Sequence, residues 1–265
     1  MILAAQIGTE NGVEWWQVVA SLALVAVAVG LSVWRDVGVE RSILWATLRA
    51  AIQLVAVGVL LGVIFESSLA DAWAWLWVGA MVGIAAYVTG GRVAWLKPLR
   101  WIALVAIGLA TGAALLLVFA LRVFPLEPVT IVVTAGITIG NTLPGTVLGA
   151  RQLDDYLRDR GGEIEALLAL GFDRRGSSRF MVPQVARTAL IPQIERTKVV
   201  GLIALPGAMT GLLLAGVDPI DAVLVQLIIM YVILGSVAVS VLAVVTLGSR
   251  LAFTDDMRLR QFTGG

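Results

Sequence analysis

Long apolar runs constrain this chain more than any other feature of its sequence. About 20 apolar residues in a helix, rising about 1.5 Å each, cross the hydrocarbon core of a bilayer. Hydrophobic residues make up 59% of the 265 residues and charged residues only 14%, a balance outside the range of soluble domains. The sequence therefore predicts an all-α polytopic membrane protein, a single membrane domain over residues 1–265 with about seven spans. The predicted spans lie near residues 15–34, 43–65, 72–90, 101–124, 129–149, 199–217 and 220–247.

The connections between these runs alternate in charge, which predicts an orientation. Loops rich in Lys and Arg stay in the cytoplasm. We therefore expect an outside N-terminus and a cytoplasmic C-terminus, with the polar segment between the fifth and sixth runs on the cytoplasmic side. The acidic, outer side carries Glu10, Glu14, Glu66, Asp71, Glu127, Asp218 and Asp221, and the basic side carries Arg35, Arg41, Arg92, Lys97, Arg100, Arg250, Arg258 and Arg260.

Several function classes are excluded by residue types that the sequence lacks. It has no cysteine and no histidine, and so no disulfide, no thiolate or imidazole metal site and no Ser-His or Cys-His nucleophile. It contains no Gly-x-x-x-x-Gly-Lys-Ser/Thr phosphate-binding loop, so it is not expected to hydrolyse ATP. No region is basic enough for nucleic-acid binding. We expect a non-catalytic, multi-pass protein of the inner or plasma membrane, in contact with the lipid bilayer and with no cofactor of its own.

Two polar residues in the second run are candidates for the transport pathway. Arg49 and Gln53 are four residues apart and so share one face of a helix. Arg49 is close enough to the cytoplasmic end for its side chain to reach the interface. Snorkelling or helix pairing is one interpretation, and a direct role in transport is the other.

The fifth run carries a polar stripe that includes Thr134, Thr138 and Asn141. Polar side chains are costly against lipid, so this face must point at a partner helix or at a pathway. Packing and pathway lining both remain open. Gly136 and Gly140, four residues apart on the same span, permit close approach of another helix.

The sixth run contains Pro206 and Gly207 near its middle, and such a pair prevents a uniform straight helix. Broken helices in membranes line cavities or are buried in protein. We expect a break here, which is either a hinge at a substrate site or an inert kink. Met209, a soft thioether two residues on, is a second candidate for this site, with core packing as the alternative.

The segment 150–198 is the only long hydrophilic stretch of the chain. A charged helix continues from the fifth run through 151–160, and 163–170 reads as a short helix with an apolar face. Gly171 is a natural C-terminal stop, and Asp173 can cap the next helix, over 174–196. So short a helix needs a partner surface. It either docks onto another protein or rests on the membrane interface.

Within this segment, Glu165-Ala166-Leu167-x-x-x-Gly171 resembles the coupling loop of ABC transporter permeases, although the Ile-x-Leu-Pro group of that loop is matched only by Met181-Val182-Pro183, one residue short. Longer blocks resemble the FetB family of iron-export ABC permeases, which includes plant half-transporters linked to aluminium tolerance. The blocks are Leu44 to Leu54, Gly140-Asn141, Arg187-Thr188-Ala189-Leu190-Ile191-Pro192, Lys198 to Gly211, and Ala215-Gly216-Val217-Asp218-Pro219.

The resemblance implies a permease subunit that exports iron or another metal, driven by a separate ABC ATPase subunit. It implies that Glu165, Ala166, Leu167 and Gly171 couple the chain to that ATPase, which would hold ATP and Mg. Seven spans are few for a complete ABC transporter, so a homodimer with two ATPase subunits is expected. A nucleotide sugar is the alternative substrate, because the plant members are associated with one. A non-transporting scaffold that recruits a cytoplasmic partner is a further alternative.

Overall fold

The computed structural model describes residues 14–93, 95–254, 256 and 258–259. Glu10 and Arg260, two of the residues used above to predict the orientation, lie outside this part of the chain. The described residues form helices joined by short turns, and only isolated β-bridges occur among them. The helices are α2 (Trp15–Trp34), α3 (Glu40–Glu66), α4 (Ala70–Gly90), α5 (Leu99–Ala120), α6 (Pro128–Asp159), α7 (Gly161–Ala169), α8 (Arg174–Val199), α9 (Gly207–Leu214) and α10 (Pro219–Leu251).

Six of these helices are long and apolar enough to cross a membrane, namely α2, α3, α4, α5, α6 and α10. They coincide with the first five predicted spans and the seventh, so an all-α polytopic membrane protein is confirmed. The continuation of the fifth span into a charged helix is confirmed as well, because α6 runs without interruption to Asp159.

The sixth predicted span, 199–217, is not one continuous helix. Helix α8 ends at Val199, and a turn follows in which Gly201 has a φ of +85° and Val200 bridges Ala204. Helix α9 then has only eight residues, which is about 12 Å of helix. The glycine at positive φ and Pro206 together stop a continuous helix, so the predicted break is confirmed and is wider than a kink.

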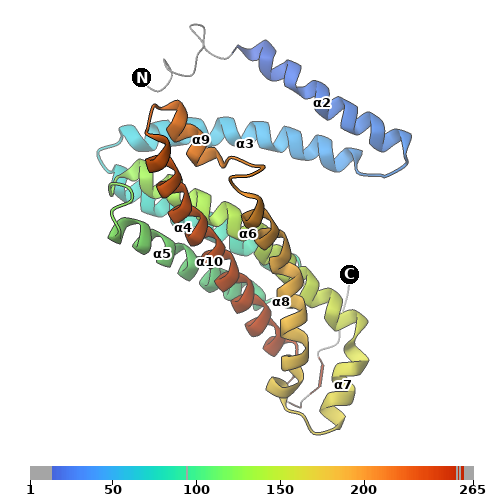
Figure 1. The fold of residues 1–265 in the computed structure, drawn as a ribbon. Helices are drawn as coiled ribbons and strands as arrows, with labels where there is room; N and C mark the ends of the chain where they lie inside the picture. Colours follow the sequence, from blue (N-terminus) through green and yellow to red (C-terminus); the bar gives the residue numbers. More distant parts are fainter. Residues whose placement is uncertain (1–13, 94, 255, 257, 260–265) are drawn as a thin grey trace. The chain divides into compact units, whose positions relative to one another are not determined.

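The chain divides into two compact units, which we describe separately. The first comprises Met1–Ala70 and Gly211–Val217, and the second Asp71–Thr210 and Asp218–Gly265. In the first unit α2 and α3 form a hairpin (Figure 1). Its turn is held by the Ser32 hydroxyl, which donates to Glu40 Oε2 at 3.0 Å and accepts from the Val39 N–H at 3.3 Å. Most other side chains of both helices are exposed within the single chain, although Ile64 of α3 is buried.

In the second unit α10 lies at the centre of the bundle and packs against α5, α6 and α8 (Figure 1). Close approach to α6 occurs at Gly145 and Gly149, where an added Cβ would lie 2.9 Å from Val237 and 3.2 Å from Val245 respectively. Helix α10 does not come close to Gly136 and Gly140: an added Cβ would lie 3.5 Å from Met81 at Gly136 and would have no atom within 4 Å at Gly140. Two serines of α10 donate to α5 carbonyls, Ser236 to Ala110 at 3.5 Å and Ser240 to Ala106 at 3.3 Å, a bonding type common between membrane helices.

The end of α4 offers a stability prediction. A Cβ added at Gly90 would lie 2.8 Å from the Cα of Arg100, so Gly90→Ala must displace backbone. Overpacking of this kind costs about 1–3 kcal/mol, and we expect the melting temperature of the purified protein to fall by about 2–12 °C. Gly83→Ala, in the same helix with nothing within 4 Å of the added Cβ, is the control and should not lower it. Equal melting temperatures for the two variants would contradict this packing.

Candidate functional site

Helix α7 ends in a glycine-based cap that its sequence specifies. Gly171 has a φ of +90°, in the region that other residues rarely adopt. The N–H of Phe172 donates to the Leu167 carbonyl at 3.1 Å, and the N–H of Gly171 donates to the Leu168 carbonyl at 3.0 Å. These two bonds form a Schellman motif. The prediction that Gly171 stops the short helix is therefore confirmed.

One face of α7 is anchored in the second unit and the other is free. Ile164 is 2% exposed and belongs to the same core as Leu157 and Met181. Glu165 and Ala166 are exposed, and Leu167 is half-buried. Leu170 is 76% exposed and Phe172 is 41% exposed. We call Glu165, Ala166, Leu170 and Phe172 the α7 surface. It combines a fixed backbone with accessible apolar side chains, which suits docking of another protein.

The next helix begins directly after this surface. Asp173 is the N-cap of α8, and its Oδ1 accepts from the Gly176 N–H at 2.7 Å, so the predicted cap is confirmed. Only four residues, 170–173, separate α7 from α8. Both junctions are fixed by hydrogen bonds to the backbone, so residues 170–173 form an ordered connection between α7 and α8.

Helix α8 is polar, yet it lies along the apolar helices of the second unit. It runs antiparallel to α6, because its Ala189 approaches Gly149 whereas its later Arg196 contacts Asn141. Arg187 is exposed, and exposed Glu195 and Lys198 pair at 2.8 Å. Charged side chains at this depth are not stable against lipid, so the outer face of α8 must meet water or protein.

A cavity of about 210 Å³ lies between α6 and α8, and we call it the α6–α8 cavity. Its main polar contact is a 2.8 Å hydrogen bond from Arg196 Nη1 to Asn141 Oδ1. Asn141 also donates from Nδ2 to the Ile137 carbonyl at 2.7 Å. The lining residues are Gly140, Asn141, Pro144, Gly145, Leu148, Ala189, Pro192, Gln193, Arg196 and Val237.

The depth of this cavity follows from helix geometry. Residues 128–150 of α6 contain no charged residue, and Asn141 lies ten residues before Arg151, which is about 15 Å along the helix. Pro144 has no N–H and leaves the carbonyl of Gly140 without its helical partner. The cavity thus joins a guanidinium, two side-chain amides and a freed carbonyl at membrane depth, a set that can bind an anionic or hydrogen-bonding group.

The predicted polar stripe on α6 does not form one site. Thr134 is 7% exposed and Thr138 is 2% exposed. Both face a narrow space beside Phe124 and Ile233, away from the α6–α8 cavity, and Thr138 Oγ1 donates to the Thr134 carbonyl at 2.8 Å. For these two threonines the structure favours packing, whereas Asn141 lines a cavity.

The remaining predicted residues lie elsewhere. Arg49 and Gln53 are exposed on α3, in the first unit, and neither has a hydrogen-bond or ion-pair partner among the described residues. Pro206 and Gly207 lie at the junction of the turn and α9. The N–H of Met209 donates at 3.2 Å to Oε1 of Gln226. This bond fixes the start of α9 to α10.

Sequence reasoning missed Arg196, Gln193 and Gln226. Arg196 lies four residues after Pro192 and seven after Ala189. These spacings place Arg196 on the same helical face as two residues of the FetB-like block, which could have marked it as a candidate. Gln226 is 5% exposed. It is a polar residue in an otherwise apolar run, and this contrast could have marked it as a candidate. Among the described residues no group of three or more Asp, Glu, His or Cys could hold a metal ion.

Comparison with known proteins places these features in a family. Residues 15–253 match the family described as "Uncharacterised protein family (UPF0014)". The chain is 37% identical over 222 residues to the UPF0014 membrane protein STAR2 of Oryza sativa subsp. japonica, covering 84% of this chain and 78% of that protein. It is 32% identical over 160 residues to the protein ALUMINUM SENSITIVE 3 of Arabidopsis thaliana (60% of this chain, 59% of that one). It is 29% identical over 136 residues to the probable iron export permease protein FetB of Escherichia coli (51% and 52%). The predicted resemblance is confirmed, and no solved structure matches the chain.

Proposed function

We propose a function from the premise that this chain belongs to the UPF0014 family of multi-pass membrane proteins. The chain is the permease subunit of an ABC transporter in the inner or plasma membrane, an exporter of iron or another metal. A separate ATPase subunit binds ATP and Mg and drives it through α7. A relative named as a probable iron export permease supports this assignment.

One observation carries the proposal: the α7 surface is connected rigidly to a polar helix that reaches the α6–α8 cavity. The exposed Ala166 and Leu170 offer a docking face, and the Gly171 and Asp173 caps join it to α8. Arg196 lies 22 residues after the start of α8, and its side chain donates a hydrogen bond to Asn141. Closure of the ATPases on ATP would move α7, tilt α8 and change access to this cavity.

Two copies of the chain are needed to complete the pathway. The exposed charged face of α8 requires water or protein beside it, and most of α2 and α3 is exposed within one chain. A homodimer in which the α8 helices face a shared aqueous path satisfies the first requirement. Contacts of α3 with the second copy would shelter Arg49 and Gln53 from lipid.

The chemistry of the α6–α8 cavity bears on the form of the substrate. It offers a cationic guanidinium and amides, and none of its lining residues is an acid, histidine or cysteine. A bare cation is repelled by Arg196, so a metal would travel as an anionic chelate. A nucleotide sugar, which is also anionic, is the alternative substrate for the same reason. A scaffold that recruits a partner without transport is the alternative from another class.

The test is ATPase stimulation in liposomes that contain the tagged chain and its candidate ATPase partner. Iron(II), iron(III) citrate and a nucleotide sugar are compared side by side at equal concentration. Stimulation by the citrate chelate with concomitant iron flux supports the proposal. Stimulation by the nucleotide sugar alone replaces the metal with that substrate. A stable complex with neither stimulation nor flux supports the scaffold instead.

A further inference from the structure

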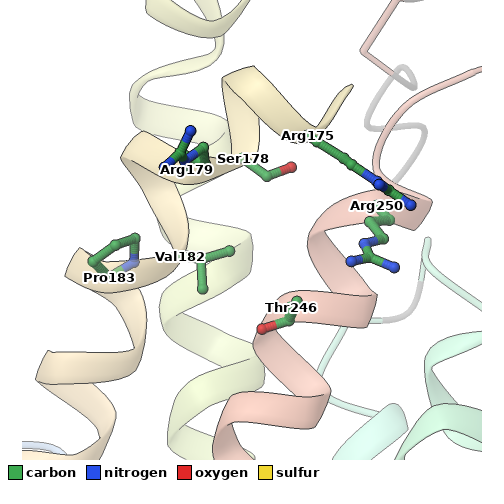
Figure 2. Close-up of a pocket in the computed structure, with 7 residues that line it drawn as sticks. All are labelled: Arg175, Ser178, Arg179, Val182, Pro183, Thr246 and Arg250. Carbon is green, nitrogen blue, oxygen red and sulfur yellow. The ribbon is translucent and has the colours of Figure 1, made fainter. Parts of the chain in front are cut away.

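A second cavity lies between the start of α8 and the end of α10, in the second unit. Its volume is about 600 Å³, and we call it the α8–α10 cavity. Figure 2 shows its seven lining residues on the two helices: Arg175, Ser178, Arg179, Val182, Pro183, Thr246 and Arg250. Three of the seven are arginines and none is acidic, so the cavity carries a concentrated positive charge.

Among the described residues, these three arginines have no ion-pair partner. Figure 2 shows Arg175 extending from α8 toward the end of α10 that carries Arg250, and neither they nor Arg179 form an ion pair or side-chain hydrogen bond with another described residue. Asp173 lines an adjoining space together with Arg175 and Arg250, and its Oδ1 caps α8. Guanidinium groups that line one cavity repel one another unless an anion binds there, and phosphate suits their forked geometry.

The cavity lies at the level of lipid headgroups. Residues 222–249 of α10 contain no charged residue, and this stretch of 28 residues is about 42 Å long. A bilayer with its headgroup regions is about 40–45 Å thick. Arg250 therefore falls at the predicted cytoplasmic headgroup layer. Further along the two helices from Arg175 and Arg250, Thr246, Val182 and Pro183 line the rest of the cavity, and Val182 and Pro183 form an apolar wall.

We propose that the α8–α10 cavity binds an anionic phospholipid of the cytoplasmic leaflet. Its phosphate lies between Arg175 and Arg250, with Arg179 at the edge, and an acyl chain follows Val182 and Pro183. Basic pockets between membrane helices on the cytoplasmic side bind such headgroups, and the apolar wall distinguishes a lipid from free phosphate. The lipid ties the start of α8, directly after the α7 surface, to α10. The inference needs only membrane insertion and is independent of the proposed transport function.

Native mass spectrometry of the purified full chain tests this proposal. Phosphatidylglycerol and phosphatidylcholine with identical acyl chains compete for the protein, and the ratio of retained lipids is measured. The wild type should prefer phosphatidylglycerol, and Arg175→Gln with Arg250→Gln should weaken that preference by about fivefold per arginine. Arg92→Gln, an exposed arginine on the same predicted side, is the matched control and should keep it.

The double variant Arg175→Lys with Arg250→Lys keeps both charges and should retain most of the preference, which shows that the glutamine variant lost charge rather than its fold. An unchanged lipid ratio in the glutamine variant would overturn the proposal. Binding of inorganic phosphate without any lipid preference would overturn it too, in favour of a soluble anion. The proposal would also be overturned if an arginine-modifying reagent reacts with these arginines in every lipid composition and only a bound ATPase subunit blocks the reaction.

Discussion

Replacing Gly171 with valine should disconnect ATP hydrolysis from transport. Gly171 caps α7 with a φ of +90°, and a residue with a Cβ loses about 1–2 kcal/mol there, more if it is β-branched. The Schellman bonds to Leu167 and Leu168 would be lost, and the α7 surface would no longer be held in register with α8. We expect flux per ATP hydrolysed, measured in liposomes with the ATPase partner, to fall by about five- to thirtyfold or more.

Gly171→Asn is the matched control for this variant. Asparagine tolerates the left-handed region and also ends helices, so it should keep most of the coupling. Both variants present the same exposed Ala166 and Leu170, and both should still bind the ATPase. Normal coupled flux in Gly171→Val would contradict a role for α7 in coupling. A loss of equal size in both variants would show that side-chain bulk, not backbone conformation, matters at this position.

Replacing Arg196 with glutamine should have the second large effect. Its guanidinium donates to Asn141 inside the α6–α8 cavity, and hydrogen bonds of charged groups contribute about 1.5–3 kcal/mol. If the substrate uses the same charge, flux at subsaturating substrate should fall by about ten- to a hundredfold. Initial rates of substrate efflux from liposomes measure this effect.

Lys198→Gln is the control for Arg196, because it removes one positive charge from the same end of α8. Lys198 pairs with exposed Glu195 and lines neither cavity, so flux should change little. A melting temperature that drops in Arg196→Gln while flux per folded protein stays normal would assign Arg196 to packing. An increase in flux for a bare cation would contradict the anionic form of the substrate.

Features fixed by local chemistry were predictable from the sequence. The stop at Gly171 and the cap at Asp173 each depend on a few neighbouring residues, and both are confirmed. The apolar runs of α2 to α6 and α10 can be recognised in the sequence by their length and composition. The break before α9 was predicted from Pro206 and Gly207, although not its extent, because the turn depends on Gly201 adopting a positive φ.

Features that depend on packing between distant residues were not predictable. Arg196 and Asn141 are 55 residues apart, and no local pattern joins them. Thr134 and Asn141 share a helical stripe by spacing alone, but α8 and α10 cover different sides of α6 and separate them. Which glycines α10 approaches was not predictable for the same reason. Gly145 and Gly149, not Gly136 and Gly140, happen to face the valines of α10.

Site-specific cross-linking tests the central claim, that a separate ATPase acts through α7, most directly. The chain has no cysteine, so a cysteine introduced by Ala166→Cys is the only thiol of this chain that a cross-linker can reach. A thiol-to-amine cross-linker should join this position of the reconstituted complex to the ATPase subunit, with a yield that changes on ATP binding. Arg92→Cys, on the same predicted side but distant in sequence from α7, should give little product. Equal yields from both positions, or none from Ala166→Cys in an active complex, would contradict the account.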